Sequence, residues 1–114
     1  MKIAVSYNSG DVYGHFGKTS TFAVYEIDGG NILSREIKDT EGKSHGELVD
    51  LLYSWNINVV FVGGIGSHAI DLLKEKGINV YTGVTGEVEK NVIDFLNGKL
   101  NHNPSMVHQC SHSH

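Results

Sequence analysis

A four-residue apolar run, Val59–Val62 (VVFV), constrains the fold of this chain more than any other segment. An uninterrupted run rich in β-branched residues is typical of a central strand that is covered on both faces. Four apolar residues at i, i+3, i+4 and i+7 precede it and predict a helix: Leu48, Leu51, Leu52 and Trp55. Further helices are expected over about Ser67–Lys76 and Gly86–Asn97, with a short strand at Ile78–Tyr81 between them. Strands that alternate with helices pair in parallel.

The N-terminal part has a different pattern. Strands are expected at Lys2–Tyr7, Thr21–Asp28 and Ile32–Ile37, the last two joined as a hairpin by Asp-Gly-Gly-Asn. Residues Asn8–Lys18 contain three glycines and no apolar periodicity, so they are expected to form a loop. Ser44, followed three residues later by a glutamate, matches the capping box at a helix start.

The predicted fold is therefore a three-layer α/β domain. Its five-stranded mixed sheet has the strand order 3-2-1-4-5, a ribonuclease-H-like motif, with helices on both faces. We expect one domain over residues 1–100 and a flexible His/Cys-rich tail over residues 101–114. Ligands bind such sheets at the carboxyl ends of the strands, where Asn8–Lys18 and Gly63–Gly66 should meet.

Composition limits the partners. The chain has 114 residues, of which 39% are hydrophobic and 19% charged, as in a single globular domain. Its nine basic residues are scattered and its formal charge is -4, so no nucleic acid is expected. No segment is long and apolar enough for a membrane, and a lone cysteine excludes an intrachain disulfide. We expect a cytoplasmic monomer or weak homodimer.

Two loops are candidates for binding. From Gly64 to Ala69 the sequence follows G-x-G-x-x-A, between a buried strand and a helix. Glycines let the backbone approach a ligand closely, and N–H groups at the helix start attract anions. NAD is disfavoured because the next strand ends in Tyr-Thr-Gly, without the acid that holds the ribose. The alternative is that these glycines make only a tight turn. His15, in the other loop, is a candidate metal ligand or proton donor, or else a surface histidine.

The tail carries a second concentration of ligand atoms. His108, Cys110, His112 and His114 alternate, so an extended chain would present all four on one side to a metal ion. The spacing is not that of a zinc finger, and the alternative is a polar terminus without a site. His45 and His68 each stand beside a predicted helix start, where an isolated histidine usually faces solvent.

Nothing in the sequence assembles an active site. Two-metal nucleases of this sheet order need clustered carboxylates at strand ends, but the first strand has Ser6 at that position. No Ser–His–Asp arrangement or nucleophile elbow is present. The sequence therefore favours a binding protein over an enzyme.

Three segments together resemble a known family. The chain is similar to the dinitrogenase iron–molybdenum cofactor biosynthesis family in these segments. They are His15-Phe16-Gly17 with Phe22, the segment VFVGGIGSHAIDLLKEKGINVY over Val60–Tyr81, and the last helix leading into Gly98-Lys99-Leu100. That family includes NifX-like proteins and the C-terminal domain of NifB. The likeness covers about residues 1–100. It implies a ribonuclease-H-like fold that binds iron–molybdenum cofactor, or its iron–sulfur precursor, and passes it to an acceptor protein.

The resemblance and the residue chemistry lead to one expected site. The expected cluster-binding residues are His15, Phe16, Gly17, Gly63, Gly64, Ile65, Gly66 and Ser67. The expected ligands to the cluster, or to a simple transition-metal ion, are His15, His108, Cys110, His112 and His114. Two alternatives remain open: a sensor of an anionic metabolite that uses the same glycine-rich loop, and a partner-binding module.

Overall fold

The computed structural model describes residues 1–100, 102, 107 and 108 of the chain. Its strands are β1 Lys2–Asn8, β2 Asp11–Val12, β3 Thr21–Asp28, β4 Asn31–Asp39, β5 Val59–Phe61, β6 Ile65–Gly66, β7 Asn79–Tyr81 and β8 Val107–His108. Its helices are α1 Gly46–Ser54, α2 Ser67–Glu75 and α3 Val88–Leu96, with a 3₁₀ turn, η1, at Phe16–Lys18.

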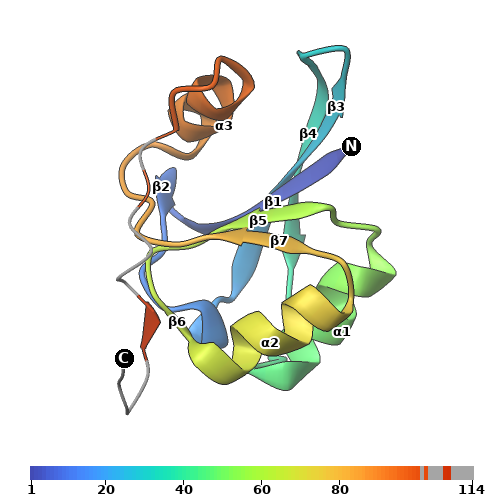
Figure 1. Ribbon diagram of the computed structural model, residues 1–114, viewed down its shortest axis with the longest axis vertical. Helices are drawn as coiled ribbons and strands as arrows, with labels where there is room; N and C mark the ends of the chain where they lie inside the picture. Colours follow the sequence, from blue (N-terminus) through green and yellow to red (C-terminus); the bar gives the residue numbers. More distant parts are fainter. Residues whose placement is uncertain (101, 103–106, 109–114) are drawn as a thin grey trace.

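The main sheet has the order β4-β3-β1-β5-β7, with the short β2 paired to β1 (Figure 1). The hairpin strands β3 and β4 are antiparallel, and β1, β5 and β7 run parallel. This confirms the predicted mixed sheet and its strand order. The first strand lies at its centre because a hairpin extends one edge, while the α-helical crossovers extend the other.

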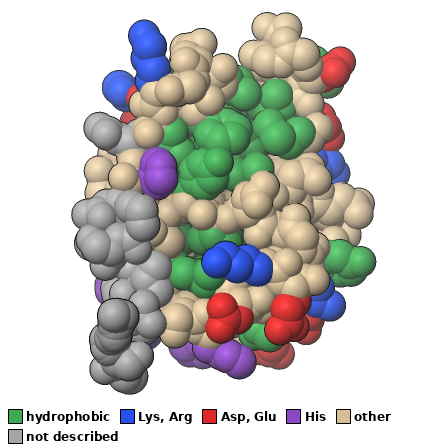
Figure 2. Space-filling model, in the orientation of Figure 1, with side chains coloured by type: hydrophobic (Ala, Val, Ile, Leu, Met, Phe, Trp, Pro, Cys, Tyr) green, Lys and Arg blue, Asp and Glu red, His purple; other side chains and the backbone are tan. Residues whose placement is uncertain are grey.

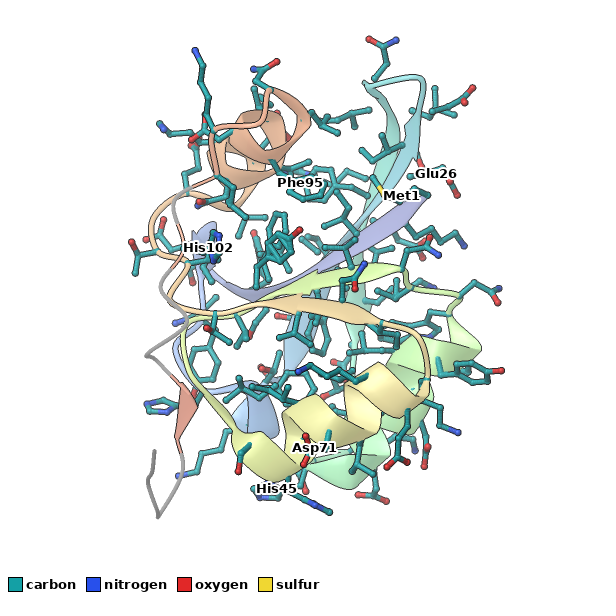
Figure 3. The ribbon with its side chains drawn as sticks, viewed as in Figure 1. Met1, Glu26, His45, Asp71, Phe95 and His102 are labelled. Atoms are coloured by element: carbon teal, nitrogen blue, oxygen red, sulfur yellow. The ribbon has the colours of Figure 1, made fainter. Side chains whose placement is uncertain are left out.

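Two apolar cores lie on opposite faces of the sheet. Helices α1 and α2 cover one face, where Ala4 and Val60 belong to the same cluster as Leu52 and Leu73. Helix α3 covers the other face, onto which Phe95 projects (Figure 3). The alternation of β1 between the two clusters is the two-residue period of a strand buried on both sides. The predicted three-layer arrangement is thus confirmed. Apolar side chains also reach the surface between α3 and the β3–β4 hairpin (Figure 2).

The segment expected to be a loop over residues 8–18 is more ordered than predicted. It contains β2, which pairs with the end of β1, and the turn η1. Ser9 and Gly10 connect β1 to β2 with φ angles of 50° and 96°. Two positive φ angles are typical of the type I′ hairpin turn, so Ser-Gly was the local signal for this pairing.

Two helix boundaries also differ from expectation. Helix α1 begins at Gly46, two residues after the predicted start at Ser44. One half of the capping box is present, since the Ser44 N–H donates to Glu47 Oε1 at 3.4 Å. The last helix begins at Val88 rather than Gly86, whose φ of 89° is incompatible with a helical turn.

The chain returns to the glycine-rich segment after α3. Strand β8 pairs in parallel with β6, with Val107 opposite Ile65 and His108 opposite Gly66. Before this, the His102 ring stacks on Tyr81 with 5.2 Å between the ring centroids. The expected tail ligands beyond His108 lie outside the described residues. Within the described part of the chain, no helix has the length and apolar character needed to cross a membrane.

Candidate functional site

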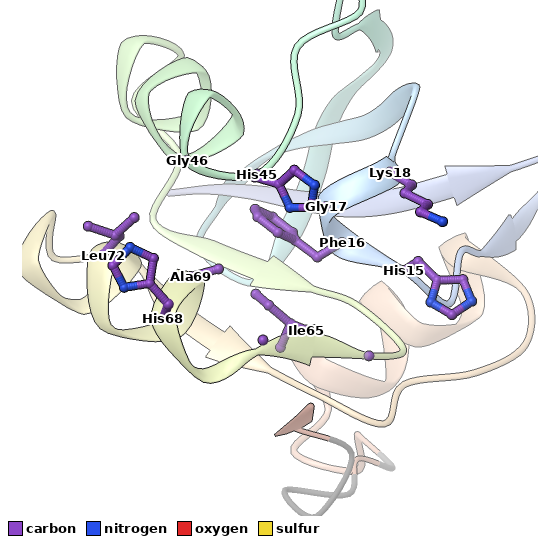
Figure 4. Close-up of a pocket in the computed structure, with 12 residues that line it drawn as sticks. His15, Phe16, Gly17, Lys18, His45, Gly46, Ile65, His68, Ala69 and Leu72 are labelled. Atoms are coloured by element: carbon purple, nitrogen blue, oxygen red, sulfur yellow. The ribbon is translucent and has the colours of Figure 1, made fainter. Parts of the chain in front are cut away.

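A pocket of about 310 Å³ opens near the carboxyl ends of β1 and β5. Turn η1, strand β6 and the N-terminal ends of α1 and α2 contribute its walls (Figure 4). The lining residues are His15, Phe16, Gly17, Lys18, His45, Gly46, Gly64, Ile65, Gly66, His68, Ala69 and Leu72. The pocket is therefore at the edge of the sheet where parallel α/β folds bind ligands.

The two loops predicted to meet at this edge are joined by backbone hydrogen bonds. His15 and Gly64 form a parallel bridge. The Gly64 N–H donates to Gly14 O at 2.8 Å, and the Phe16 N–H donates to Gly64 O at 2.9 Å. Because its N–H is used in this way, Gly64 supplies a wall of the pocket rather than a free donor for an anion.

Gly63 explains how closely the loops approach. A Cβ atom on Gly63 would lie 2.8 Å from Gly14 Cα, closer than such atoms come in real structures. Gly63 is buried and is not part of the pocket lining. The glycine at this position therefore permits loop-to-loop packing, and the ligand would contact the residues that follow it.

The floor of the pocket is apolar and buried. Phe16 and Ile65 are buried, and the Phe16 ring packs against Phe22 with 6.1 Å between the centroids. Two buried hydroxyls hold η1 in place: Ser6 Oγ and Thr19 Oγ1 share a hydrogen bond of 2.7 Å, and Thr19 Oγ1 also donates to the His15 carbonyl. Ser6, at the position where a nuclease would need a carboxylate, thus supports the pocket loop.

The rim of the pocket carries one lysine and three histidines. His15, Lys18, His45 and His68 all line it and are exposed, and no aspartate or glutamate is among the lining residues. The chain as a whole has 13 acidic and nine basic residues. The rim therefore differs in sign from the average surface and suits an anionic ligand.

His45 has an unusual backbone conformation. Its φ of 52° and ψ of -121° favour glycine, and a larger residue in such a region costs about 1–3 kcal/mol. Its imidazole lies against Gly17, where an added Cβ would be 2.7 Å from His45 Nδ1. The His45 N–H also donates to Gly17 O at 3.3 Å. Gly17 therefore leaves the space that the His45 ring occupies.

The structure brings together most of the residues expected from the sequence. His15, Phe16, Gly17, Gly64, Ile65 and Gly66 line the pocket. Ser67 instead begins α2, whose N-cap residue, Gly66, has no side chain to cap the helix. The first N–H groups of a helix lack partners within the helix, and at α2 no N-cap side chain accepts from them.

Sequence reasoning gave too little weight to His45 and His68, and it did not single out Lys18. The histidines are exposed, as expected, but at the pocket rim. Their position in the sequence could have indicated this. Both stand at the starts of helices on one face of the sheet, and crossover helices begin at the edge where the strands have their carboxyl ends. In the described part of the chain, no three His, Cys, Asp or Glu residues are placed to hold one metal ion.

Comparison with known proteins is consistent with this architecture. Residues 1–98 match the family described as dinitrogenase iron-molybdenum cofactor. The protein MJ0580 of Methanocaldococcus jannaschii is 31% identical over 105 residues, which cover 88% of this chain and 89% of that protein.

Solved structures share the fold. The crystal structure of PH0822 superposes with a TM-score of 0.87 at 28% identity, covering 93% of this chain and 97% of that one. The apo form of the orange protein from Desulfovibrio gigas gives a TM-score of 0.74 at 25% identity, with 90% and 92% covered.

Proposed function

The chain belongs to the dinitrogenase iron-molybdenum cofactor family, and on that premise we propose that it binds an anionic metal–sulfur cluster in the pocket and passes it to an acceptor protein. The cluster is iron–molybdenum cofactor or an iron–sulfur precursor of it. In this proposal the protein is a carrier and catalyses no reaction.

The charge of the pocket is the observation that carries the proposal. An acidic chain places one lysine and three histidines, and no carboxylate, around a single cavity. Metal–sulfur clusters are anionic, and their sulfides accept hydrogen bonds from N–H groups. The N-terminal end of α2 adds the positive end of a helix dipole on the same side.

The ligand set favours a transferable cluster over a permanent one. Resident iron–sulfur clusters are usually held by four cysteine thiolates, and this chain has one cysteine. Imidazole nitrogen, backbone N–H groups and charge would hold a cluster less tightly than four thiolates. His15 is the proposed metal ligand in the pocket. The backbone of Gly64, Ile65 and Gly66 is proposed to form the wall of the pocket that contacts the cluster.

The tail is proposed as an auxiliary set of ligands. Pairing of β8 with β6 brings the chain at His108 alongside Gly66, which lines the pocket. Cys110, His112 and His114 follow within six residues of His108 in the sequence. In this proposal they supply further ligands, which receive a cluster from the pocket or release it.

Anaerobic reconstitution with iron and sulfide tests the proposal. The full chain should acquire iron, sulfide and a visible absorption band, and His15→Ala should acquire much less. A chain lacking residues 105–114 should take up less metal and lose β8 as well, so Cys110→Ser serves as the milder tail variant. If His15→Ala and the truncated chain both bind as much metal as the parent, the site assignment is wrong.

A second candidate, a sensor of a small organic anion, draws on the apolar floor. Phe16, Ile65 and Leu72 line the same pocket as Lys18 and the three histidines, and such a combination also suits a carboxylated or phosphorylated metabolite. Cys110→Ser separates the two functions, because it removes one tail ligand and leaves β8 paired with β6. It should weaken the binding of a cluster but leave the binding of a metabolite unchanged.

A further inference from the structure

Two histidines at the starts of different helices share the pocket with His15. His45 immediately precedes α1, and His68 is the second residue of α2. All three line the same cavity, and in Figure 4 the His45 ring lies between the other two. They are 30 and 23 residues apart along the chain (15 to 45, 45 to 68), so only the packing of α1 and α2 on one face of the sheet brings them together.

Their arrangement is wrong for a single ion. A tetrahedral zinc-like ion needs several ligand atoms at about 2.0–2.3 Å from one point. No group of three His, Cys, Asp or Glu in the described residues is placed in this way. The cavity that the three histidines surround measures about 310 Å³, which is room for an object of many atoms. Groups spread around such a cavity can each contact a different side of one cluster.

The backbone of His45 argues against a purely structural role. The residue occupies a region that favours glycine, with φ of 52° and ψ of -121°. Glycine would adopt this conformation without strain, yet the position carries a large side chain. The residue that faces this side chain, Gly17, is a glycine, and it leaves room for the His45 ring above the pocket floor.

We propose that His45 and His68 bind the cluster together with His15, so that three imidazoles at the starts of η1, α1 and α2 hold a multinuclear cargo from different sides. This inference rests on the proposed function and adds the residues that select a cluster over a single metal ion. Imidazole can serve as a metal ligand through a ring nitrogen, or as an N–H donor to a sulfide.

The test measures how fast reconstituted protein loses its cluster. The full chain and its variants are loaded anaerobically with iron and sulfide, and a chelator then removes the metal. His45→Asn keeps a residue that tolerates positive φ, and His68→Gln keeps a polar helical residue. Each should lose iron about tenfold faster or more than the parent, the effect of one lost charge-assisted contact. The matched control, His102→Gln, alters a histidine that stacks on Tyr81 outside the pocket and should behave as the parent.

His45→Gly separates a binding role from a structural one. It should raise the urea midpoint of the unloaded protein, because strain is relieved, while it accelerates cluster loss. Iron supplied without sulfide should be retained equally by the parent and by the His45 and His68 variants.

Two failures are distinguishable. If the parent binds a cluster and His15→Ala loses it, but the His45 and His68 variants retain it as the parent does, this inference is overturned and the carrier function stands. If the parent acquires no cluster, the proposed function fails and the inference fails with it.

Discussion

Adding one methyl group at Gly63 should separate the two loops that form the pocket. The Cβ of Gly63→Ala would lie 2.8 Å from Gly14 Cα and 3.3 Å from Tyr13 O, and both contacts are with backbone that cannot rotate away. Neither Gly14 nor Gly63 has a positive φ, so alanine is acceptable to the backbone at both positions. Space alone decides the outcome.

The expected loss of stability follows from these contacts. Overpacking a well-packed interior costs about 1–3 kcal/mol. Moving the loops apart would also weaken the bond from the Gly63 N–H to Tyr13 O and the bond from the Gly64 N–H to Gly14 O, now 3.2 and 2.8 Å. The two weakened bonds together are counted as one lost hydrogen bond, which costs ~1 kcal/mol. Added to the cost of overpacking, this gives a decrease in unfolding free energy of about 2–4 kcal/mol.

Urea denaturation of the unloaded protein measures this loss. With a slope of about 2 kcal/mol per molar urea, the midpoint should fall by about 1–2 M at an unchanged slope. Gly14→Ala is the matched control, because a Cβ there meets nothing within 4 Å, and it should leave the midpoint unchanged or slightly raised. A Gly63→Ala midpoint equal to that of Gly14→Ala would refute the close-approach argument.

Three further outcomes are expected. Gly17→Ala should displace the flexible His45 ring, because the new Cβ would lie 2.7 Å from His45 Nδ1. The variant should retain a cluster less well, while its unfolding free energy falls by less than about 1 kcal/mol. Cluster retention equal to that of the parent would contradict this expectation. Burial raises the pKa of the Tyr25 phenol, so the stability that its neutral form contributes is present below pH ~10 and is lost as the pH rises through the raised pKa. Spectroscopic alkaline titration should show one late tyrosine that Tyr25→Phe removes, and titration of all tyrosines together would count against it. Leu48→Ala should cost about 2–5 kcal/mol in urea denaturation, because Leu48 is fully buried, whereas Leu33→Ala, at a side chain 61% exposed, should change stability by less than ~0.5 kcal/mol.

Much of the fold could be predicted because its signals are local. The apolar run at Val59–Val62 and the helical spacing before it depend on residues within two turns of one another. The right-handed crossover rule then orders the parallel strands, and the hairpin at Thr21–Asp28 extends the other edge. Shorter elements were missed where the evidence is only a dipeptide, as at Ser9-Gly10, or where pairing is with a distant segment, as for Ile65–Gly66.

The candidate site divides in the same way. The sequence by itself determined that a glycine-rich turn and His15 would meet at the carboxyl edge, because strand order alone brings those two loops together. Only the tertiary structure decided which groups face the cavity. The N–H of Gly64 is used by Gly14, and His45 and His68 join His15 because α1 and α2 pack side by side. This arrangement depends on how the two helices are oriented on the sheet, and the periodicity of the sequence does not determine that orientation.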